Sequence, residues 1–122
     1  MSKLPVFLIG GAGPIARREF ATLIEALDPA RQIVPLDMVV FHGGPPPPDF
    51  SLEIETSALL SAMDATDAGR GHLLGYSGGA AVALAFACAH PERAASLTLE
   101  ELAWVGSDGA TALEERFWRE LT

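Results

Sequence analysis

Short apolar runs alternate along the chain with longer stretches that mix apolar and polar residues. The first run, residues 5–9, is rich in β-branched and aromatic side chains and ends at two glycines. This pattern indicates a buried strand. Similar runs predict a strand over residues 33–41, a third that ends at Tyr76, and a fourth over residues 95–99.

Two amphipathic stretches separate the first three predicted strands. Their spacing predicts helices over residues 15–27 and 51–65, the second with Ser51 at its N-cap. The apolar residues of each stretch recur at helical spacing and predict its inner face: Phe20, Leu23, Ile24 and Leu27 in the first, and Ile54, Ala58, Leu59 and Met63 in the second.

Two further helices follow the third and fourth strands. Residues 79–89 are apolar on every side, so we expect a central, buried helix with Cys88 as a small packed hydrophobe and His90 at its C-terminal end. The stretch 111–121 is amphipathic, and Thr111 and Glu114 have the spacing of a capping box. Strand and helix thus alternate throughout. The order predicts an α/β fold of three layers, with a parallel sheet of about four strands between helices.

Composition narrows the possible partners. The chain has 122 residues and a formal net charge of −8, which suits one acidic domain and argues against nucleic acid or an anionic membrane surface. The apolar run 80–89 is too short to cross a bilayer, and the N-terminus lacks the pattern of a secretory signal. With a single cysteine, we expect a reducing, cytoplasmic setting. The histidines are scattered and no Cys-x-x-Cys occurs, so we expect no metal site. We expect no cofactor either, unless the NAD(P) alternative described below applies.

The segment Gly75–Gly79 carries the strongest chemical signal. It reads Gly-Tyr-Ser-Gly-Gly, between an apolar run and the alanine-rich helix. Small residues on either side of Ser77 permit a sharp strand-to-helix turn that exposes its hydroxyl. The helix N-terminus would favour a negative charge that develops there. The segment predicts a nucleophilic serine.

The glycine-rich segment 11–16 permits three interpretations. Gly-Ala-Gly-Pro-Ile-Ala fits the fingerprint of a dinucleotide-binding loop, with Asp37 within loose reach of the ribose-binding position. The glycines could also serve only to turn the chain. In the third interpretation, amides of this loop form one half of an oxyanion hole, and Gly78 supplies the other half.

Taken in order, four segments resemble the α/β-hydrolase superfamily from its third to its sixth strand, over nearly the whole chain. They are residues 7–13, residues 37–44 with His42-Gly43-Gly44, the motif Gly75–Gly79, and Pro91-Glu92-Arg93. The resemblance implies that Ser77 is the nucleophile and that the amides of Ala12 and Gly78 form the oxyanion hole. It also implies that residues 1–110 are a partial hydrolase core, and that the helix within 111–122 begins a cap or lid.

The resemblance also indicates what the chain lacks. In this superfamily the triad acid and histidine follow the nucleophile late in the chain. The histidines here are His42, in the proline-rich loop, His72, at the strand end opposite Ser77, and His90. We expect none of them to act as the base, and we expect Glu100 and Glu101, after the fourth strand, to be solvated.

We therefore expect the N-terminal part of a serine hydrolase that cleaves ester or amide bonds through an acyl-Ser77 intermediate and is weakly active or inactive alone. Its partners would be a small-molecule substrate and either a second copy or a missing C-terminal half. Two alternatives remain: an NAD(P)-binding domain that uses residues 11–16, and a non-catalytic, hydrolase-like module that binds a ligand or partner.

Overall fold

Four parallel strands form the centre of the fold, in the order β2-β1-β3-β4. The computed structural model describes residues 3–11, 15–41 and 51–102. The strands are β1 (Val6–Ile9), β2 (Ile33–Leu36), β3 (Gly71–Tyr76) and β4 (Ala94–Glu100). The helices are α1 (Ala16–Glu19), α2 (Ala21–Ala26), α3 (Leu52–Asp64) and α4 (Gly78–Ala89), with 3-10 turns η1 (Val39–Phe41) and η2 (Pro91–Arg93).

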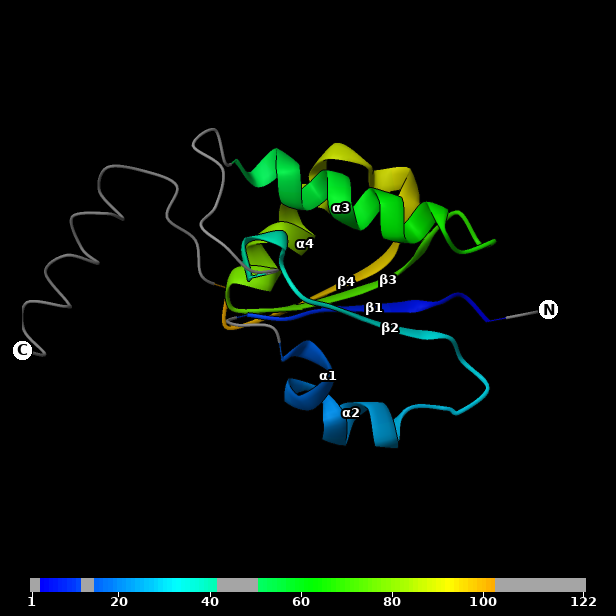
Figure 1. Ribbon diagram of the computed structural model, residues 1–122. Helices are drawn as coiled ribbons and strands as arrows, with labels where there is room; N and C mark the ends of the chain where they lie inside the picture. Colours follow the sequence, from blue (N-terminus) through cyan, green and yellow to red (C-terminus); the bar gives the residue numbers. More distant parts are fainter. Residues whose placement is uncertain (1–2, 12–14, 42–50, 103–122) are drawn as a thin grey trace, which may run out of the picture.

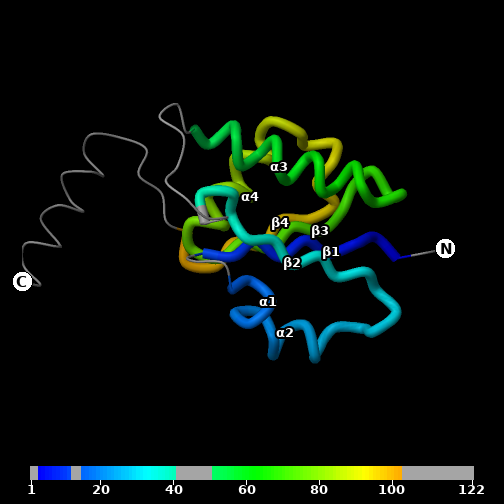
Figure 2. The backbone as a smooth tube through the Cα atoms, in the orientation of Figure 1, coloured from blue at the N-terminus to red at the C-terminus, as the bar shows by residue number. Residues whose placement is uncertain are grey.

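The helices cover both faces of the sheet. Helices α1 and α2 lie on one face, and α3 and α4 lie on the other (Figure 1). The chain crosses from β1 through α1 and α2 to β2, and then over to α3 (Figure 2). The predicted three-layer α/β fold with a four-stranded parallel sheet is confirmed.

The core divides into two clusters because successive side chains of a strand point to opposite faces of the sheet. Phe7 and Ile9 of β1 pack toward α3 and α4, whereas Leu8 packs toward α1 and Phe20. The larger cluster is closed by buried residues of β3, α3 and α4: Leu59, Met63, Leu73, Val82, Ala83 and Phe86. The parallel pairing Val6↔His72 through Ile9↔Gly75 brings the carboxyl ends of β1 and β3 together.

Three expectations about local structure were wrong. The predicted helix over residues 15–27 is divided at Phe20, which has φ −99° and ψ 14° and buries its side chain in the cluster around Leu8. The second strand ends at Leu36 and not at Phe41, because the N–H groups of Val39 and Val40 donate to a side chain of α3 instead of a neighbouring strand. The helix predicted within residues 111–122 is not one of the three, because it lies outside the described residues and stays a prediction.

The third error concerns Cys88, which is exposed near the end of α4. Helix α4 buries Gly79, Ala80, Val82, Ala83 and Phe86, so one side of this apolar helix faces the core and Cys88 lies on another side. Over residues 3–11, 15–41 and 51–102, no helix combines the length and the apolarity needed to cross a membrane.

Candidate active site

Ser77 lies at the sharp turn between β3 and α4, as the sequence predicted. Its φ of 54° and ψ of −117° fall in a region that residues with a side chain rarely adopt. A serine that caps a helix normally has extended backbone and bonds to an amide of the first turn. Ser77 makes no such side-chain bond. Its hydroxyl is therefore not used to cap α4.

The glycines of the motif are required by close backbone contacts. A Cβ placed on Gly75 would lie 2.4 Å from the carbonyl oxygen of Gly79. A Cβ placed on Gly79 would lie 2.3 Å from the carbonyl oxygen of Ile9 in β1. Any side chain at either position would push α4 away from the sheet. The motif thus fixes where the helix begins and, with it, where Ser77 stands.

The turn at Ser77 is hydrogen-bonded to β4 and lies close to the residues that follow β1. The N–H of Ser77 donates to the carbonyl oxygen of Glu100 at 2.9 Å, which continues the pairing of β3 with β4. On the other side, a Cβ added to Gly11 would lie 3.0 Å from Cβ of Ser77. The segment that follows β1 therefore begins directly against Ser77.

Of the two predicted oxyanion-hole residues, Gly78 and Ala12, only Gly78 lies within the described residues. Gly78 is the first residue of α4, and the first amides of a helix have no partner within it. Ala12 lies outside the described residues. Its neighbour Gly11 is buried beside Ser77, so the loop that contains Ala12 starts next to the predicted nucleophile.

Two carboxylates hold the ends of the loop 12–14. The N–H of Gly11 donates to Oε1 of Glu19 at 3.1 Å, and the N–H of Ala16 donates to Oδ1 of Asp37 at 2.7 Å. In a dinucleotide-binding loop the pyrophosphate lies at the start of the helix. Here the amides of Gly11 and Ala16 already donate to carboxylates, so neither is left to bind a pyrophosphate. These contacts argue against the NAD(P) interpretation.

The described histidines lie away from Ser77. His72 is near the start of β3, at the opposite end of the strand, and its Nδ1 lies 2.7 Å from Oγ of Ser96. His90 is the C-cap of α4, with its ring centroid 5.0 Å from that of Phe86. His42 lies outside the described residues. Glu100 and Glu101 are both exposed, as expected. In the part of the chain that the structure describes, no group of three His, Cys, Asp or Glu side chains could hold a metal ion.

Glu55 is the residue that the sequence analysis missed. It is only 4% exposed, and its two carboxylate oxygens accept the N–H groups of Val39 at 2.8 Å and Val40 at 3.0 Å. Residues four apart share one side of a helix, so the spacing of Glu55, Leu59 and Met63 could have placed Glu55 on the buried side.

Comparison with solved structures gave close similarity in fold. A meta-cleavage product hydrolase from Pseudomonas fluorescens IP01, in complex with acetates, is 28% identical with a TM-score of 0.73, over 88% of this chain and 41% of that protein. A hydrolase from Pseudomonas aeruginosa PA01 is 25% identical with a TM-score of 0.72, over 100% of this chain and 46% of that protein. A marine microorganism esterase, 19% identical with a TM-score of 0.72, shares the fold over 95% of this chain and 46% of that protein.

The chain thus spans less than half the length of these three structures. Comparison with curated protein sequences gave no match. The family model described as alpha/beta hydrolase fold matches residues 5–121, nearly the whole chain. With the parallel sheet and the sharp turn at Ser77, this match shows that the chain belongs to the α/β-hydrolase fold family.

Proposed function

We propose that this chain is the nucleophile-bearing N-terminal part of a serine hydrolase that cleaves ester or amide bonds of a small molecule. The observation that carries the proposal is the backbone of Ser77, held at φ 54° between β3 and α4 with its hydroxyl unused for capping. Strained backbone of this kind is concentrated at functional sites.

In the proposed reaction, Oγ of Ser77 attacks the carbonyl carbon of the substrate and forms a C–O bond. The hydroxyl proton passes to a base, which then protonates the departing alcohol or amine as its bond to the carbonyl carbon breaks. Water hydrolyses the acyl-serine by the reverse sequence and releases the acid. The amides of Gly78 and Ala12 stabilise the negative charge on the carbonyl oxygen in both halves of the reaction.

The base and its acid partner are proposed to come from a C-terminal half. The exposed apolar surface of the chain supports this. Leu97 and Leu99 of β4 are exposed at the edge of the described sheet. A groove of about 730 Å³ opens beside α2 and includes Phe20, Leu23 and Leu74 among its walls. Further elements of a hydrolase fold could cover both. We place residues 111–122, by the same proposal, at the start of a cap.

The setting is proposed to be cytoplasmic, since the lone thiol of Cys88 is free and exposed.

Labelling with a serine-reactive fluorophosphonate tests the nucleophile. We expect slow labelling of this chain, because activation of the serine needs a base beside it. Ser77→Ala should abolish the labelling, and Ser57→Ala, at an exposed serine of α3, should leave it unchanged. Labelling that survives Ser77→Ala would refute the role of Ser77. Labelling as fast as that of a complete serine hydrolase would refute the missing base.

A further inference from the structure

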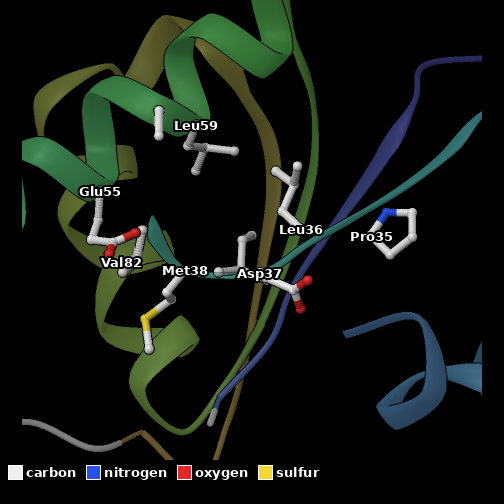
Figure 3. Close-up of a pocket in the computed structure, with 9 residues that line it drawn as sticks. Pro35, Leu36, Asp37, Met38, Glu55, Leu59 and Val82 are labelled. Carbon is white, nitrogen blue, oxygen red and sulfur yellow. The ribbon is translucent and has the colours of Figure 1, made fainter. Parts of the chain in front are cut away.

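An apolar cavity of about 320 Å³ lies between α3, α4 and the carboxyl end of β2. Seven of its nine lining residues are apolar, among them Leu36, Met38, Leu59 and Val82, and the other two are Asp37 and Glu55. Leu36 and Leu59 project toward one another across it, whereas the carboxylate of Asp37 is directed away (Figure 3). The volume is at the lower end of the range of about 300–1,000 Å³ that is usual for small-molecule sites.

Met38 connects this cavity to the turn at Ser77. It lines the cavity, and its Cε would lie 3.0 Å from a Cβ added to Gly78, the residue next to Ser77. Gly78 and Val82 are four residues apart, so they share one side of α4. The cavity therefore begins about one helical turn, roughly 5.4 Å, along α4 from the predicted oxyanion amide. The flexible side chain of Met38 lies against both the cavity and Gly78.

Glu55 determines the character of the cavity wall. Its carboxylate is buried and accepts two amides of η1, which fixes the segment that directly follows Met38. Both carboxylate oxygens of Glu55 thus already accept hydrogen bonds from backbone N–H groups. A second negative charge beside this carboxylate would be repelled, because charges interact strongly where water is excluded. The wall favours a neutral, apolar occupant over one with a terminal carboxylate.

We propose that this cavity is the acyl pocket of the Ser77 site and takes a neutral aliphatic acyl chain, with Met38 as the residue that admits it. The proposal rests on the proposed function, since it places the acyl group on Ser77. The substrate class is then an ester or amide of a short- to medium-chain aliphatic acid.

Methyl NMR of the chain labelled at methionine Cε tests the cavity directly. The sequence has three methionines, and Met63, fully buried in the core, serves as an internal control for intact packing. Met38→Leu assigns the Met38 signal. We expect 1-hexanol to shift that signal saturably and to leave Met63 unmoved, and we expect adipate, which carries a charge at each end, to shift neither.

Two variants of α3 make the test specific. Ala58→Leu fills the cavity and should reduce the hexanol-induced shift of Met38 at least tenfold, whereas Ser57→Leu adds the same side chain at the exposed neighbouring position and should preserve it. An unchanged Met63 signal verifies that each variant is folded. A shift of equal size in Ala58→Leu, or no saturable shift in the native chain, would overturn the proposal.

Covalent labelling separates this proposal from the proposed function. Ser77 is labelled to completion with butyl, hexyl and octyl fluorophosphonates, and the longer chains should move the Met38 signal further. A labelled Ser77 with an unmoved Met38 methyl would refute the acyl pocket alone. A chain in which hexanol shifts Met38 but Ser77 cannot be labelled would refute the serine mechanism and leave only a binding cavity.

Discussion

Replacement of Gly79 by alanine should destabilise the protein strongly although alanine is the better helix former. The added Cβ would lie 2.3 Å from the carbonyl oxygen of Ile9 and 2.5 Å from that of Gly10. Ordinary contacts begin at 3.4 Å, so the shorter distance falls short by 3.4 − 2.3 = 1.1 Å. Both partners are backbone atoms at the end of β1, a central strand, so no side-chain rotation relieves the clash.

The expected magnitude follows from two opposing effects. Overpacking a core costs about 1–3 kcal/mol, and rigid backbone partners place Gly79→Ala at the upper end. The higher helix propensity of alanine offsets up to about 1 kcal/mol of this loss in stability. We expect a net loss of about 2 kcal/mol in the free energy of unfolding, which lowers Tm by roughly 8 °C for a domain of this size.

Gly78→Ala is the matched control. It adds the same methyl group in the same helical turn, but its nearest neighbours are the flexible Cε of Met38 at 3.0 Å and the carbonyl oxygen of Gly11 at 3.3 Å, only slightly inside ordinary contact. We expect its stability to stay within about 0.5 kcal/mol of the native value, because the tightest contact is with the end of a flexible side chain that can move. Urea unfolding followed by circular dichroism measures both variants. If Gly79→Ala were as stable as Gly78→Ala, the close approach of α4 to β1 would be wrong.

Three further predictions concern single side chains. Ser77→Gly should be about 0.5–1 kcal/mol more stable than Ser77→Ala in thermal unfolding, because only glycine adopts positive φ without strain; equal stability would refute the strain at this turn. Glu55→Gln should lower the free energy of unfolding by about 2 kcal/mol, because the side-chain NH2 of the glutamine would face the N–H of Val39 or Val40. Glu53→Gln, on the exposed side of α3, is the control and should change little, and similar urea midpoints for the two variants would contradict the role of Glu55. Cys88 should react fully with a thiol reagent in the native state, and reaction only in denaturant would show that it is buried.

The elements that local pattern controls were predictable from the sequence. The apolar runs placed β1, β3 and β4 to within about two residues at most ends, because buried strands need continuous apolar residues. The motif Gly75–Gly79 predicted the sharp turn at Ser77, since glycine is the residue that permits such close backbone contacts. The resemblance to α/β-hydrolases rested on these same segments, and the family is confirmed.

Only the tertiary structure decided the features that depend on contacts between distant segments. Strand β2 ends at Leu36 because the N–H of Val39 donates to Glu55 and not to a neighbouring strand. Glu55 lies sixteen residues further along the chain. The assignment of Asp37 to the amide of Ala16, which argues against a dinucleotide site, likewise joins residues 21 positions apart. The cavity beside Met38 arises where three elements meet. The sequence pattern predicts local structure because that depends on residues close together along the chain. The contacts of Glu55, of Asp37 and around the cavity form only when the folded sheet brings distant segments together.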